Sequence, residues 1–97
     1  MAKSTSSADM AAFISEFSRE AAKYIRKLDF ITKERLRERI GKLENDPFPQ
    51  GIERVQGQGS DLVFRIRVGD QRILYIVRYH PDKIIIVKID KRSRVYN

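Results

Sequence analysis

Three arginines lie on two stretches of alternating apolar and polar residues that a single short turn separates. Arg65 and Arg67 precede the turn, and Arg72 follows it. The pair Gly69-Asp70 fits a two-residue hairpin loop, with glycine at the first central position as a type II′ turn prefers. A hairpin folded on this loop places Arg67 opposite Arg72, with Arg65 beside Leu74 on the same side.

This arginine cluster has the chemistry of an anion site. Like charges that lie directly opposite one another destabilise a sheet by roughly 0.2–1 kcal/mol. Phosphate is the first candidate ligand, because the planar guanidinium fork matches its geometry. The alternative is an ordinary solvated sheet face. We favour the anion site because the nearby acids Asp61 and Asp70 lie in predicted loops, so no carboxylate is expected to compensate the arginines.

Composition limits the kinds of site and partner. The 97 residues suffice for one domain, and residues 51–97 carry +5 of the formal net charge of +7 (ten Lys/Arg against five Asp/Glu). A basic face of this kind points to nucleic acid or to an acidic protein. No apolar run reaches about 18 residues, so no membrane partner is expected and the cytoplasm is the default location.

The sequence predicts neither a metal nor a cofactor. It has no cysteine, and its single histidine, His80, precedes a turn proline, which favours a structural role. Asp90 lies beside Lys91 and Arg92, so we interpret it as an ion-pair partner rather than a metal ligand. An enzyme built from these residues has to use a substrate that supplies its own nucleophile, as RNA does with its 2′-hydroxyl group. Clustered cations can orient the scissile phosphate and stabilise a pentacoordinate transition state, leaving a 2′,3′-cyclic phosphate.

The N-terminal half is expected to hold one strand and a helical hairpin. Residues 1–10 are polar and are interpreted as a disordered leader, followed by a domain of residues 11–97 whose first strand is 11–17. Ser18 is suited to cap the first helix and Thr32 the second. The second helix ends at the proline-rich residues 45–49. Its apolar stripe consists of Leu36, Ile40 and Leu43.

The C-terminal half is expected to form the rest of the sheet. Residues 52–56 read as a short edge strand, and the arginine hairpin follows. Its apolar side is the predicted core: Phe64, Ile66, Val68, Ile73, Tyr75 and Val77. Residues 80–83 fit a type I turn with proline at the second position. The apolar run 84–90 then predicts a last strand buried on both faces.

The overall prediction is an α+β fold. A small, twisted, mainly antiparallel sheet carries an N-terminal helical hairpin on one face, in the order β-α-α-β-β-β. One residue more or less in the last turn would exchange the faces of the last strand, so Lys88 and Arg92 are not assigned to a face. The basic tail ends with Tyr96, which could stack on a base.

Several of these features together resemble the RelE/ParE superfamily of toxin–antitoxin toxins. They are the helical hairpin, the stop at residues 45–47, the stretch 63–75, the strand 84–89 and the closing residues 91–96. The resemblance covers about residues 11–97. It implies either a RelE-like, ribosome-dependent endoribonuclease that cuts mRNA in the A site, or a ParE-like inhibitor of DNA gyrase. A basic binding module without catalysis is a third interpretation.

The resemblance also implies catalytic roles for five residues: Arg65, Arg67, Arg72, Arg92 and Tyr96. Because all five positions hold suitable residues, we favour the nuclease. Lys88, Lys91 and Arg94 are further candidates for RNA binding. The best-described nucleases of the family have lysine at the first two positions, and arginine is a poor general base because its pKa exceeds about 12.

The resemblance further implies partners. The ribosome and mRNA would be the targets, and a small RelB-like antitoxin would hold the toxin silent. Electrostatic steering would speed the binding of an acidic antitoxin to a chain of charge +7. Contact with operator DNA would come only through the antitoxin.

Overall fold

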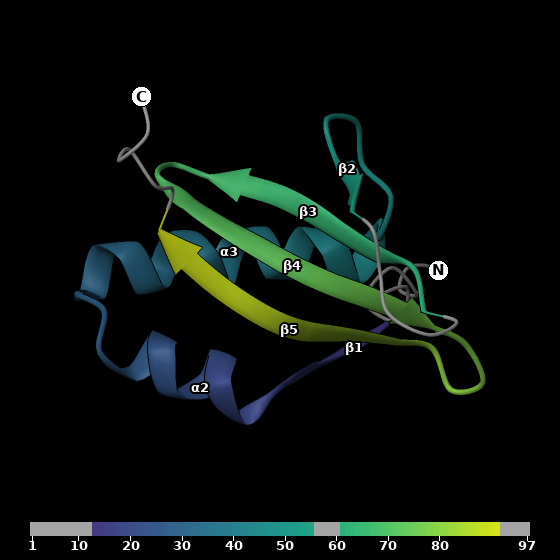
Figure 1. Ribbon diagram of the computed structural model, residues 1–97, viewed down its shortest axis with the longest axis horizontal. Helices are drawn as coiled ribbons and strands as arrows, with labels where there is room; N and C mark the ends of the chain where they lie inside the picture. The colour runs from purple at the N-terminus through teal and green to yellow at the C-terminus, as the bar shows by residue number, and fades with distance from the viewer. Residues whose placement is uncertain (1–12, 56–60, 92–97) are drawn as a thin grey trace, which may run out of the picture.

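The computed structural model describes residues 13–55 and 61–91, so the predicted leader lies outside the described residues. In Figure 1, α3 lies behind a five-stranded sheet and α2 lies below it, next to β5 and β1; the strand order is β1-β5-β4-β3-β2. β1 pairs with β5 in parallel and the other neighbours are antiparallel. The elements are β1 (Ile14–Phe17), α2 (Arg19–Arg26), α3 (Phe30–Asn45), β2 (Glu53–Val55), β3 (Val63–Val68), β4 (Gln71–Arg78) and β5 (Lys83–Lys91). This is the predicted α+β fold. Four strands follow the helices, one more than in the predicted order β-α-α-β-β-β, because the short edge strand β2 is a full member of the sheet.

The two helices begin at capping side chains. The Ser18 hydroxyl accepts a hydrogen bond from the Ala21 N–H at 3.0 Å, which confirms the predicted cap. The second predicted cap, Thr32, is wrong, because α3 begins at Phe30 and Asp29 caps it. The Asp29 carboxylate accepts from the Thr32 N–H at 3.1 Å and from its hydroxyl at 2.7 Å. Thr32 is therefore a donor to the cap, and these hydrogen bonds lower the pKa of Asp29.

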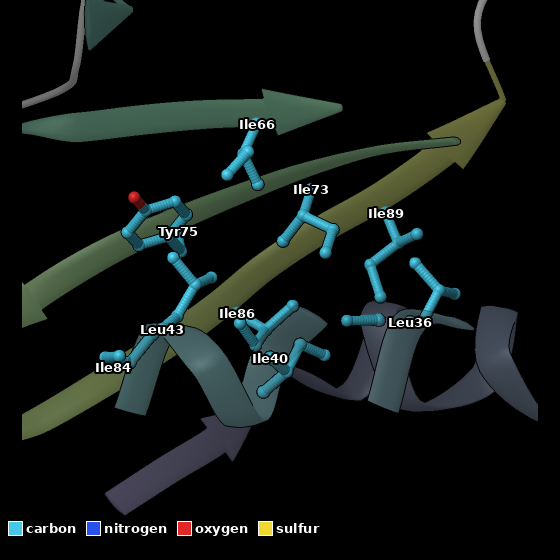
Figure 2. Close-up of a cluster of buried hydrophobic side chains, with 10 residues drawn as sticks. Leu36, Ile40, Leu43, Ile66, Ile73, Tyr75, Ile84, Ile86 and Ile89 are labelled. Atoms are coloured by element: carbon cyan, nitrogen blue, oxygen red, sulfur yellow. The ribbon is translucent and has the colours of Figure 1, made fainter. Parts of the chain in front are cut away.

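The core lies between α3 and the near face of the sheet, as Figure 2 shows. The predicted helical stripe is buried, and the predicted apolar side of the hairpin faces it. Tyr75 is fully buried, and its hydroxyl donates to the Pro47 carbonyl at 2.8 Å. Burial raises the pKa of Tyr75 to about 12. The buried apolar side chains are Ala21, Leu36, Ile40, Leu43, Ile66, Ile73, Tyr75, Ile84, Ile86 and Ile89.

The central hairpin has the predicted register. Val68 pairs with Gln71 and Arg67 with Arg72. Gly69 has a φ of +64°, as the first central position of a type II′ turn requires. The edge strand β2 pairs with residues 63–65 of β3, so the second half of β3 is left without a neighbour on that side.

The last strand differs from its prediction of burial on both faces. Ile84 and Ile86 are buried, whereas Ile85 is half-buried and Lys88 is exposed. The preceding connection is a four-residue turn, 79–82, with a cis His80–Pro81 peptide bond, in place of the predicted type I turn.

A β-bulge at Val87 explains why the pattern of this strand is hard to interpret. Tyr75 pairs with Ile86 but Leu74 pairs with Lys88, so Val87 is an extra residue on β5. The Val87 carbonyl accepts a hydrogen bond from the Ser18 hydroxyl at 2.7 Å. Beyond the bulge the alternation is inverted, which buries Ile89 and turns its neighbours to the far face.

Candidate nucleic-acid interface

Two rows of side chains cross the face of the sheet that the helices leave open. One row runs Arg67, Arg72, Asp90 across β3, β4 and β5, because these residues are direct cross-strand partners. The second row, one pleat further along, runs Arg65, Leu74, Lys88. We call these six residues the arginine face. No described helix covers it (Figure 1).

The structure brings together four of the eight predicted site residues. Arg65, Arg67, Arg72 and Lys88 share the arginine face. Lys91 does not belong to it, because it pairs with Gln71 on the helix side and its Nζ lies 3.9 Å from an Asp70 carboxylate oxygen. The other three, Arg92, Arg94 and Tyr96, lie outside the described residues.

The expectation that no carboxylate compensates these arginines is wrong. Glu53 on the neighbouring strand accepts hydrogen bonds from Arg65, including one from Nε at 2.8 Å. Asp90 accepts from the Arg72 Nε at 3.1 Å. Neither pairing with these arginines was expected, since the β2–β3 register and the bulge in β5 are set by contacts distant in sequence. The sequence did hold one signal for Glu53: it lies in the predicted edge strand 52–56, which could pair with the arginine hairpin.

Asp90 is an ion-pair partner, as predicted; of the two expected partners, Lys91 lies beside Asp70 instead and Arg92 is outside the described residues. Asp90 contacts Arg72, and Lys88 Nζ lies 4.0 Å from its second oxygen. The hydrogen bonds and charge of Arg65 lower the pKa of Glu53, with a smaller contribution from the charge of Arg67. Glu53 is therefore a weak base.

Arg67 differs from its neighbours. Its side chain is exposed, and within residues 13–55 and 61–91 no carboxylate pairs with it. The arginine face and the neighbouring Glu53 together have four cations against two carboxylates, a formal net charge of +2. A surface with this excess of positive charge attracts phosphate groups. Separately, the described residues contain no cluster of three or more side chains that could hold a metal ion.

The single histidine lies away from this site. His80 lies in the turn at the opposite end of the sheet from the hairpin loop. Of the described helices, neither is both long enough and apolar enough to cross a bilayer.

Comparisons with known proteins identify the family. The model of the ParE toxin of the type II toxin–antitoxin system parDE matches residues 15–96. A protein of Methanocaldococcus jannaschii that carries the toxin name RelE1 is 32% identical over 84 residues, which cover 84% of this chain and 91% of that protein.

Solved structures agree with this assignment. A chain of the archaeal RelE–RelB complex from Pyrococcus horikoshii OT3 matches with a TM-score of 0.74 at 26% identity, covering 86% of this chain and 98% of that chain. The isolated Escherichia coli RelE toxin has the same fold, with a TM-score of 0.69 at 20% identity over 86% of this chain and 87% of that chain. With its sheet, helical pair and basic open face, this chain belongs to the RelE/ParE superfamily of toxins of type II toxin–antitoxin systems.

Proposed function

We propose that this toxin is a ribosome-dependent endoribonuclease that cleaves mRNA in the A site and so inhibits translation. The observation that carries the proposal is the opposed pair Arg67 and Arg72 on an uncovered sheet face, flanked by Arg65 and Lys88. A small basic site of this kind has little surface for selecting RNA, which favours dependence on the ribosome for presenting the substrate.

The proposed reaction needs no metal. The RNA 2′-oxygen forms a bond to the adjacent phosphorus, its proton leaves to solvent, and the bond from phosphorus to the 5′-oxygen breaks. The leaving 5′-oxygen takes up a proton from solvent, so the products are a 2′,3′-cyclic phosphate and a free 5′-hydroxyl group. Arginine holds its proton too firmly to act as a base, so Arg67 stabilises the developing 2′-oxyanion electrostatically.

The remaining residues hold the phosphate and the leaving group. Arg72 and Arg65 bind the scissile phosphate. The recorded hydrogen bond from Arg72 to Asp90 uses Nε, and the terminal nitrogens of the guanidinium fork then serve the phosphate. On the basis of the family resemblance, Arg92 offsets charge on the leaving 5′-oxygen and Tyr96 orients the nucleotide.

The proposed partners follow from the same surface and from the relatives. Matching chains from Pyrococcus horikoshii and Escherichia coli come from toxin–antitoxin complexes. A RelB-like antitoxin is accordingly the proposed partner of this toxin, with operator DNA contacted only through it. The ribosome and mRNA as targets place its action in the cytoplasm.

The first test is primer extension on an mRNA bound to ribosomes, beside the same mRNA without ribosomes. Wild-type toxin is expected to cut within the A-site codon only when ribosomes are present. Arg72→Ala is expected to lower the cleavage rate at least about a hundredfold, the scale of losing one preorganised charge-stabilising group. Arg78→Ala is the matched control, because Arg78 lies on the same strand and face but pairs with Asp61 at the far end. Equal cleavage by the two variants would exclude the proposed site.

A ParE-like gyrase inhibitor is the second candidate function, since the matching family model is that of a ParE toxin. Supercoiling by purified gyrase in the presence of the toxin distinguishes the two. Removal of residues 92–97 is expected to abolish RNA cleavage under the nuclease proposal. Gyrase inhibition by both the full chain and this truncation, without RNA cleavage by either, would favour the second candidate.

A further inference from the structure

A hollow of about 390 Å³ lies beside the arginine face, at the edge of the sheet. Its walls come from α3, from the chain that leads into β2, and from β3. β2 pairs with β3 only as far as Arg65, so the edge of β3 beyond that residue is open to the hollow. The lining includes Arg39, Gln50, Gly51, Glu53, Arg65 and Arg67.

The hollow carries an excess of positive charge. It is lined by three arginines and one carboxylate, a formal net charge of +2. Glu53 is committed to Arg65, to which it is hydrogen-bonded. Neither Arg39 nor Arg67 has a carboxylate partner in the described parts of the chain. Two guanidinium groups of one small hollow thus remain available for an anion.

Arg39 is the residue that makes this hollow distinct from the arginine face. It belongs to α3, on the other side of the sheet, and its side chain is half-buried. Arg39 is near enough to Tyr75 for its positive charge to lower the pKa of that hydroxyl group, against the larger increase caused by burial. Arg39 therefore approaches the end of β2 from the helix side, whereas Arg67 approaches from the open face.

We propose that this hollow binds a backbone phosphate of the RNA next to the scissile phosphate. Arg65 and Arg67 line the hollow and also belong to the arginine face, so the two sites are contiguous. Arg67, which has no carboxylate partner among the described residues, would lie between the two phosphates. This inference rests on the proposed nuclease function. It adds a binding role for Arg39, and it implies that the RNA strand leaves the arginine face past the edge strand β2.

The test measures binding without cleavage. The probe is a fluorescent hexanucleotide of 2′-O-methyl RNA, which has no free 2′-hydroxyl to attack. Arg39→Gln is expected to weaken its binding about tenfold, the scale of one hydrogen bond to a charged group. The slope of log K against log salt concentration is expected to shrink by about 0.7, the value for one phosphate contact of a single strand.

Two further variants make the result specific. Arg37→Gln is the matched control, because Arg37 lies on the same helix, is exposed and does not line the hollow. It is expected to bind the probe like the wild type. Arg39→Lys keeps the charge and is expected to restore the salt slope while recovering only part of the affinity. Thermal melting of each variant confirms that the chain remains folded.

The outcomes separate this inference from the nuclease proposal. Equal binding by Arg39→Gln and Arg37→Gln, or no binding of the probe by the wild type, would overturn the inference even if ribosome-dependent cleavage is found. A specific loss in Arg39→Gln, in a toxin that cleaves mRNA on ribosomes, would support both. The same loss in a toxin that does not cleave would retain the hollow as a phosphate site and reject the nuclease.

Discussion

The two faces of the sheet are built by the same strands but differ in what touches them. Ile73 and Leu74 are adjacent on β4, yet Ile73 is fully buried in the core and Leu74 is only half-buried between Arg65 and Lys88. One face is closed by apolar contacts, and the other is open and held by ion pairs. Burial of apolar area stabilises a domain far more than exposed ion pairs do. The helix-covered face therefore maintains the fold, which leaves the open face free to carry unfavourable charge.

The largest expected effect tests this division by truncating two neighbouring residues. Ile73→Ala is expected to lower the free energy of unfolding by about 3 kcal/mol, because it leaves a cavity in the core. Leu74→Ala, on the opposite face, is expected to cost about 1 kcal/mol or less. Urea unfolding measures both. Similar losses for the two variants would mean that the open face also contributes to the core.

A smaller effect concerns the polar group within the closed face. Tyr75→Phe is expected to lower the free energy of unfolding by about 1 kcal/mol, because the Pro47 carbonyl loses its donor. The comparison is Tyr79→Phe in the exposed turn, which is expected to leave stability unchanged.

The same hydroxyl group gives a pH dependence. Its pKa is raised from 10.0 to about 12, so the stability linked to it is fully present below pH 10. That stability is lost as the pH rises from about 10 to about 12, because the unfolded chain ionises first. Urea unfolding across this range is expected to show a shallower alkaline decline for Tyr75→Phe than for the wild type. Parallel declines would contradict the assignment.

The smallest expected effect lies on the open face. Glu53→Gln removes the charge that neutralises Arg65 and is expected to tighten binding of the 2′-O-methyl hexanucleotide about threefold, the scale of one exposed ion pair. Protonation of Glu53 has the same sign, so binding to the wild type is expected to tighten as the pH falls through its lowered pKa, below 4.5. Glu34→Gln, whose partner Arg37 lies on α3, serves as the control. Weaker binding by Glu53→Gln would show that Arg65 needs this carboxylate for its orientation.

The two faces also differ in how well the sequence predicts them. The closed face follows local rules, because alternation and helical spacing identify Leu36, Ile40, Leu43 and the apolar side of the hairpin. The pairing of Arg67 with Arg72 is equally local, since a two-residue loop fixes the register on both sides of it.

Long-range contacts account for what the sequence could not predict. Glu53 reaches Arg65 through a pairing set by the β2 connection, and Arg39 reaches the hollow through helix packing. The cap at Asp29 was missed because aspartate and threonine, three residues apart, both suit that role. Lys88 could not be assigned to a face because a bulge leaves no mark in an apolar run, and Arg92 lies outside the described residues.

The bulge at Val87 makes the length of β5 part of the site. Four apolar residues, 84–87, precede Lys88, and their exact types matter less than their number. Loss of Val87 would close the bulge and keep Ile86 opposite Tyr75 and Lys88 opposite Leu74. One added residue has no such outlet, and it would turn Lys88 and Asp90 to the helix side and Ile89 to the open face. The Ser18 hydroxyl, at the start of the first helix, donates a hydrogen bond to the Val87 carbonyl and so stabilises the bulge at this position. A single-residue insertion in this segment would therefore damage both the fold and the charged face, whereas exchanges among isoleucine, valine and leucine would spare them.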